Sequence, residues 1–248
     1  MVQDTPSKLK HDAIVEAVFE VRFDLPPASV PEIFVGRLAS AEAWRGYNQV
    51  RLPIADIPVV VRRSDENLRY QPTIEVVHPD GNRSIRIGEQ VIAYSRRAPY
   101  PGWDVFGLEI EDTIEALFSV ENSISVTRLG LRYMNALRSD LHTIDSISDL
   151  NIELRSGGDA IVDHFNFNYT LSPSDNISGT VRIATKDFVQ GQIPLNSTLL
   201  VDIDMSSRGD LSFKDSRSAA DWARRAHDEE KRLFFGLLTP EKISQLID

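Results

Sequence analysis

The stretch ISVTRLGLRYMNAL, residues 124–137, reads as one long β-strand, and the prediction of the fold is built outward from it. Side chains in a strand alternate between its two faces. One face of this stretch carries Arg128, Gly130, Arg132 and Met134, and the other carries Leu129, Leu131, Tyr133 and Asn135. The pattern predicts a strand whose two sides meet different surroundings, one of them charged and the other mostly apolar.

Strands joined by tight turns are predicted before this stretch. Residues 15–23 alternate apolar and polar side chains, which indicates a strand with one buried face. Residues 59–97 are predicted to form an antiparallel meander that begins with a strand at 59–62. Asp80-Gly81 supplies the backbone conformation that a hairpin turn needs. The first half of the chain is therefore expected to be rich in antiparallel pairs.

Each half of the chain also contains one long amphipathic helix. Between residues 103 and 118, apolar side chains recur at spacings of three and four. Strands at 165–171, 177–184 and 198–205 precede a second helix, which Asp215 or Ser216 can cap. The predicted buried stripe of this helix consists of Ala219, Trp222, Ala223, Ala226, Leu233, Phe234 and Leu237. Both halves thus show strands followed by a long helix.

These elements predict an α+β fold of antiparallel sheets, with the long amphipathic helices packed on one face. The shared order suggests two similarly ordered lobes, an N-terminal α+β lobe at 1–140 and a C-terminal α+β lobe at 141–248, packed as one compact unit. No residue-level repeat links the halves, although a duplication would explain the order. Glycine-rich βαβ units are not evident, which argues against a doubly wound nucleotide-binding fold.

The composition narrows the classes of function. The chain of 248 residues has 27 basic and 37 acidic residues, which gives a net charge of −10. That charge opposes binding to nucleic acid and to anionic membranes. The chain lacks cysteine, so disulfides and thiolate chemistry are excluded. Without a signal-like segment or an apolar run near the roughly 20 residues of a membrane helix, a cytoplasmic protein is expected.

Motifs for metals, phosphates and hydrolysis do not stand out. The five histidines have no second histidine at metal-binding spacing, and no phosphate-binding glycine loop follows a strand. Asp202 and Asp204 share a strand face that is interpreted as solvent-facing. The charged run at 227–230 is interpreted as a solvated helix face, and no nucleophile elbow is present. We therefore expect no metal, no cofactor and no catalytic residue.

The two arginines of the central stretch have two interpretations. They lie about 13 Å apart along a strand that rises roughly 3.3 Å per residue, so they cannot clamp one carboxylate symmetrically. They could form cross-strand ion pairs, for which Glu16, Glu20, Asp202 and Asp204 are the available acids. Alternatively, they could follow an extended anion. Gly130 between them indicates a bulge or a close approach to the backbone.

Three motifs in order give the chain a resemblance to a known family. They are AIVEAVFEVRF at 13–23, the R-x-G-L-R-Y-x-N pattern at 128–135, and His227 followed by Phe234 or Phe235 and Thr239. The chain resembles a sporadically distributed prokaryotic protein family of unknown function, and the resemblance spans most of its length. It departs at Ala13, where the family has proline. The patchy distribution implies mobile genes linked to defence or toxins.

The leading hypothesis is a non-enzymatic binding or regulatory protein, with antitoxin, immunity and defence-accessory roles as candidates. A protein partner or a homo-oligomer is expected, and the net charge argues against a nucleic-acid partner. The predicted ligand- or partner-binding residues are Arg128, Arg132, Asn135 and His227. The alternative is an enzyme or sensor for a small anionic ligand held by Arg128 and Arg132, with His227 as an acid or base. That alternative requires a cleft in which these side chains converge.

Overall fold

A computed structural model gives the fold, and it describes residues 6, 8–174, 176–189, 191–208, 213 and 215–247. Its centre is one antiparallel sheet of nine strands in the order β2-β3-β4-β5-β1-β6-β11-β10-β9. These strands are β1 (Ile14–Asp24), β2 (Asn48–Arg51), β3 (Ile74–Val77), β4 (Arg83–Ile87), β5 (Val91–Arg97), β6 (Ser125–Leu137), β9 (Asn166–Ser174), β10 (Ile177–Thr185) and β11 (Leu199–Ser207). A separate hairpin pairs β7 (Arg155–Ser156) with β8 (Asp159–Ala160).

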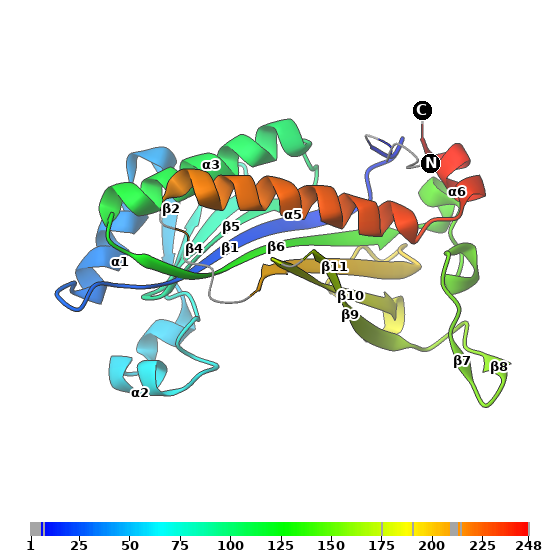
Figure 1. Ribbon diagram of the computed structural model, residues 1–248, viewed down its shortest axis with the longest axis horizontal. Coiled ribbons are helices and arrows are strands. Elements are labelled where there is room, and N and C mark those ends of the chain that lie inside the picture. The colour runs from blue at the N-terminus through cyan, green and yellow to red at the C-terminus, as the bar shows by residue number, and fades with distance from the viewer. Residues whose placement is uncertain are drawn as a thin grey trace.

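Helices connect and cover the strands. The α-helices are α1 (Pro31–Ala39), α2 (Val59–Ser64), α3 (Trp103–Val120), α4 (Ser139–His142), α5 (Ser216–Gly236) and α6 (Pro240–Leu246). The 3₁₀ helices are η1 (Glu42–Trp44), η2 (Pro53–Asp56), η3 (Ile147–Asp149) and η4 (Lys186–Phe188). The two long helices lie side by side on one side of the sheet (Figure 1). The α+β class with long helices on one face is therefore confirmed.

The helices dock because each presents an apolar stripe at helical spacing. Phe106, Ile110, Ile114 and Leu117 of α3 are almost fully buried, and α5 packs on β6 and β11. Burying each large apolar side chain contributes roughly 1.5–3 kcal/mol, so this packing outweighs local helix propensity. Asp215 caps α5, as expected, because its side chain accepts a hydrogen bond from the backbone N–H of Ser218.

Strands β1 and β6 form the central pair of the sheet. They run antiparallel with Phe19 opposite Leu131 and Glu20 opposite Gly130. Both halves of the chain contribute strands to the same sheet and side chains to the same apolar core. The structure shows this one sheet and does not show the two predicted lobes.

One predicted strand is wrong. Residues 59–62 belong to helix α2. Their valines favour a strand, but the carbonyl of Pro58, the N-cap residue, accepts the first hydrogen bonds of the helix from the N–H groups of Val61 and Arg62. Arg62 and Arg63 then bind the buried carboxylate of Glu89, with N–O distances of 2.9 and 2.8 Å, which holds the helix against the β4–β5 turn. These long-range contacts override the local propensity.

No helix in the described part of the chain is long and apolar enough to cross a membrane.

Candidate functional site

Strand β6 divides its conspicuous residues between the two faces of the sheet. Leu129, Leu131 and Tyr133 point toward the helices and are at most 1% exposed. Arg128 and Arg132 point to the opposite side, which we call the open face. The alternation predicted from the sequence is therefore confirmed, and it places side chains only one residue apart on opposite sides of a sheet.

Arg128 lies flat over Gly130. A Cβ atom at position 130 would fall 2.9 Å from Nη1 of Arg128, which is closer than such contacts allow. In this position Nη1 donates to Glu20 Oε1 at 2.7 Å, and Nη2 lies 3.7 Å from Asp204 Oδ2. Glu20 also accepts a hydrogen bond from Nε of Arg22 at 2.7 Å. Gly130 thus provides the close approach that the sequence suggested.

Arg132 forms a two-pronged ion pair with Asp202. Its Nε and Nη2 donate to the two carboxylate oxygens at 2.7 and 2.6 Å. These hydrogen bonds raise the pKa of Arg132 above its ordinary value. The side chain of Asp202 is only 6% exposed, whereas that of Arg132 is 41% exposed. The pair therefore covers a buried carboxylate with a guanidinium that keeps one edge in solvent.

Asp204 lies between the two arginines on the open face. Burial raises the pKa of its carboxyl group, while the charges of Arg128 and Arg132 act in the opposite direction. Both arginines are thus engaged by internal carboxylates. An anion from solution would have to compete with Glu20, Asp202 and Asp204, so the geometry favours the structural interpretation of the arginines over an anion grip.

Asn135 has a structural position. It is 3% exposed, and its Nδ2 donates to the backbone carbonyl of Val201 at 3.3 Å. This bond links β6 to β11 from the helix side of the sheet. A buried amide needs such a partner, because an unpaired polar group in the core is costly.

His227 lies on the helix side, away from both arginines. Its ring stacks on Trp103 of α3, with centroids 4.0 Å apart and planes 3° from parallel. Its Nδ1 is 3.2 Å from the hydroxyl of Tyr133, which in turn is 3.1 Å from the hydroxyl of Tyr100. Burial and, to a smaller extent, the charge of Lys231 lower the pKa of His227 to about 4, so the ring is neutral at pH 7.

Glu230, one turn after His227, is a buried carboxyl group that the sequence analysis placed wrongly. It is 5% exposed and belongs to the buried stripe of α5, whereas Asp228 and Glu229 are more exposed. Burial raises the pKa of Glu230 to about 8, so the group is mostly protonated at pH 7. Its position could have been predicted, because Ala226, Glu230 and Phe234 follow one another at spacings of four.

The four predicted site residues therefore form no common site. The sheet separates Arg128 and Arg132 from His227, and Asn135 is buried beside β11. Among the described residues, no group of three or more histidine or acidic side chains could hold a metal ion. The cleft required by the enzyme alternative, with both arginines and the histidine converging, is absent from the described part of the chain. What remains is a broad charged sheet face.

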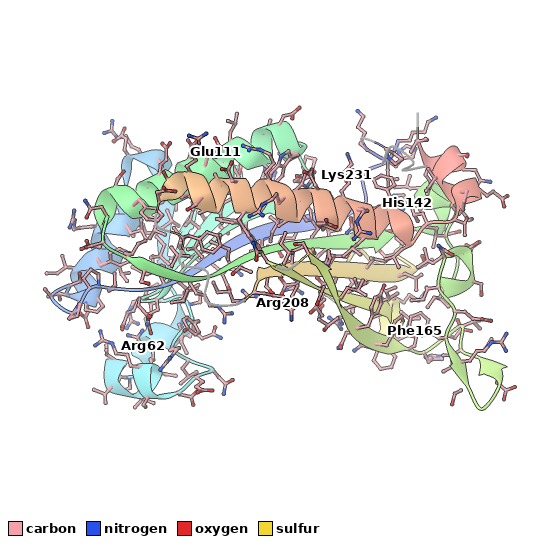
Figure 2. The ribbon with its side chains drawn as sticks, viewed as in Figure 1. Arg62, Glu111, His142, Phe165, Arg208 and Lys231 are labelled. Carbon is pink, nitrogen blue, oxygen red and sulfur yellow. The ribbon has the colours of Figure 1, made fainter. Side chains whose placement is uncertain are left out.

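Both ends of the open face are bounded by other segments. Near the first end, the guanidinium of Arg22 lies 4.6 Å from the centroid of the Tyr70 ring, in the segment after α2. Near the second end, Val189 and Ile193 pack with Met134 on the same side of the sheet. Figure 1 shows α2 and the β7–β8 hairpin projecting away from the long helices at these two ends, and Arg62 and Phe165 mark them in Figure 2.

Comparison of the chain with protein-family models and with curated proteins finds no match.

Proposed function

We propose that this protein is a non-enzymatic binding or regulatory protein that recognises a protein partner through the open face of its sheet. The observation that carries the proposal is the asymmetry of the sheet. The long helices α3 and α5 both lie on one side, while charged side chains of β1, β6 and β11 on the other side remain partly exposed. A large, rigid and hydrogen-bonded surface suits the recognition of another macromolecule.

The charge pattern of the open face supports a protein as the partner. Arg22 and Arg128 flank Glu20, and Arg132 meets Asp202. A polyanion such as nucleic acid would meet carboxylates beside these arginines, which would oppose its binding. A protein surface with charges of both signs can instead match the alternation, which gives specificity and orientation.

The family resemblance supports the same class of function. The R-x-G-L-R-Y-x-N pattern divides into an ion-paired face and a packed face, and neither part assembles a nucleophile with a base. A scaffold of this kind fits an antitoxin, an immunity protein or a defence accessory, which act by binding. We place the protein in this group on the basis of both the resemblance and the open face.

We further propose that the similar order of elements, predicted as lobes at 1–140 and 141–248, arose by duplication, with the junction between α3 and β6. The sheet order supports this, because β1 and β6 lie at its centre, and the strands that follow each of them in the chain lie outward on its own side. The segment from β1 to α3 and the segment from β6 to α5 each run from a long central strand through a short helix and further strands to a long helix.

The proposal can be tested by capture of partners with variants of the open face. Thr180→Arg adds a large charged side chain opposite Asp204, within the proposed contact area. Ser119→Arg makes a comparable change on an exposed position of α3, on the helix side, and serves as the matched control. Quantitative mass spectrometry should identify at least one protein that is captured by the wild type and by the control. The same protein should be lost when Thr180→Arg is the bait.

Hydrogen exchange then locates the contact. With the recovered partner added, backbone amides of β6 and β11 should exchange more slowly than in the free protein. If no protein is enriched over a mock bait, or if Thr180→Arg retains every protein that Ser119→Arg retains, the proposed binding face is wrong.

A further inference from the structure

The two edges of the sheet are built differently. The first edge, β2, has only four residues and ends at Arg51, whose side chain pairs with Asp56. Pro53 follows after one residue and starts η2. A short strand, a charged end and a nearby proline are the features by which natural proteins prevent edge-to-edge pairing. The β2 edge is therefore protected.

The opposite edge, β9, lacks this protection over most of its length. It has nine residues with the sequence NFNYTLSPS, and none of them is charged. Its only strand neighbour among the described elements is β10. Pro173 lies near its end, so residues 166–172 remain free of proline. A long, uncharged and exposed edge strand is a ready template for a further strand.

Each face of β9 has a uniform character. The face on the open side carries Asn166, Asn168, Thr170 and Ser172, all exposed. The other face carries Phe167 and Tyr169, whose rings stack 6.2 Å apart, and Leu171, which is 37% exposed. Helix α5 packs on β6 and β11, farther into the sheet, so this apolar row reaches the margin of the molecule.

We propose that β9 pairs antiparallel with β9 of a second copy of this chain, about a two-fold axis at Tyr169. In this register Tyr169 faces Tyr169 of the second copy, and Phe167 faces Leu171 of the second copy. On the other face, Asn168 meets Thr170 and Asn166 meets Ser172. Aromatic and aliphatic side chains thus meet each other on one side, and hydrogen-bonding side chains meet on the other.

A second copy is the favoured occupant because the strand is complementary to itself. A two-fold axis brings every side chain of the strand close to side chains of the same strand, so a charged edge would repel its own copy. The chain has a net charge of −10, yet this edge has no charge in it. Repulsion between the two bodies remains, and added salt should therefore strengthen the dimer by screening it.

The oligomeric state of the purified chain tests the proposal without any other partner, so it is independent of the proposed function. Sedimentation equilibrium should show a dimer for the wild type that tightens with salt. Thr170→Lys places a charge at the proposed contact and should give a monomer. Ser119→Lys, on the exposed side of α3, should remain a dimer. Circular dichroism checks that both variants are folded.

The register can be tested separately because the chain has no cysteine. Under mild oxidation, Tyr169→Cys should give a disulfide-linked dimer, since residue 169 faces itself across the axis. Leu171→Cys should not, because its copy lies four residues along the strand, about 13 Å away, beyond the roughly 7 Å that a disulfide spans. A monomeric wild type, a dimer that survives Thr170→Lys, or equal cross-linking of the two cysteine variants would overturn the proposal.

Discussion

The guanidinium group of Arg128 occupies the space that a side chain at position 130 would fill, with Nη1 only 2.9 Å from the ideal Cβ position of Gly130. This contact explains why a glycine is compatible with the middle of the longest strand in the sheet. The glycine lets the arginine lie along its own strand and reach Glu20 on β1. The absence of a side chain at position 130 and the ion pair between Arg128 and Glu20 are therefore coupled.

Gly130→Ala should displace Arg128 with little net change in stability. The displaced ion pair with Glu20 is partly exposed and contributes about 0.2–1 kcal/mol. Replacing a glycine in a strand interior by alanine stabilises the folded protein by roughly 0.5–1 kcal/mol. The coupling is better measured by a double-mutant cycle: Arg128→Gln should lower the free energy of unfolding in the wild type and have a smaller effect in the Gly130→Ala background.

Urea unfolding of the four proteins gives the coupling energy of this cycle. Gly36→Ala provides a control, because no heavy atom lies within 4 Å of the Cβ position there. Additive effects of Gly130→Ala and Arg128→Gln would show that the two residues are not coupled.

Arg132 and Asp202 should respond unequally to substitution. Arg132→Gln leaves the buried carboxylate of Asp202 without its two hydrogen bonds, which we expect to lower the free energy of unfolding by about 1–3 kcal/mol. Asp202→Asn leaves a guanidinium that is 41% exposed and can be hydrated, so its effect should be below about 1 kcal/mol. Denaturant unfolding at pH 7 compares the two variants, and equal or reversed effects would contradict the burial argument.

The sequence allowed the faces of β6 to be predicted, because alternation along a strand is a local property. It also allowed the acids that could pair with its arginines to be named. The particular pairs could not be predicted, since Glu20 is 108 residues from Arg128, and Asp202 is 70 residues from Arg132. These pairs depend on the order and register of β1, β6 and β11, which are set by the whole sheet.

The wrong predictions for α2 and for Glu230 have a similar origin. The valines of α2 favour a strand by propensity, and only contacts with Glu89 far along the chain decide otherwise. Glu230 was assigned to a solvated helix face from its charged neighbours, although its spacing from Ala226 and Phe234 places it in the buried stripe. In both cases local composition predicted the structure less well than the contacts or the spacing did. The helical spacing alone would have corrected the prediction for Glu230.

Glu230 should make the protein less stable as the pH rises. Its pKa is about 8 in the folded protein against 4.5 in the unfolded chain, so the folded state binds more protons between these values. The contribution of Glu230 to the free energy of unfolding therefore falls as the pH rises from 4.5 through 8, by at most about 1.4 kcal/mol per pH unit. Glu230→Gln removes this fall, and it should be more stable than the wild type at pH 9 and similar to it at pH 5.

Glu229→Gln is the matched control, because it makes the same change on the neighbouring, more exposed residue. Thermal and urea unfolding between pH 6.5 and 9 should show the fall in the wild type and in Glu229→Gln. A fall of equal size in Glu230→Gln would mean that another group causes it.

His227 should produce the opposite slope at lower pH. Its pKa is about 4 in the folded protein against 6.5 in the unfolded chain, so the unfolded state binds more protons between these values. The stability contributed by the neutral ring is present above pH 6.5 and is lost as the pH falls through 4. In the wild type this slope offsets that of Glu230 between pH 4.5 and 6.5; in Glu230→Gln it should appear as a rise in stability with pH. NMR titration of the histidine ring protons, assigned with His227→Phe, should give a midpoint well below 6.5 for His227, and a midpoint at or above 6.5 would show that its stacking on Trp103 does not desolvate the ring.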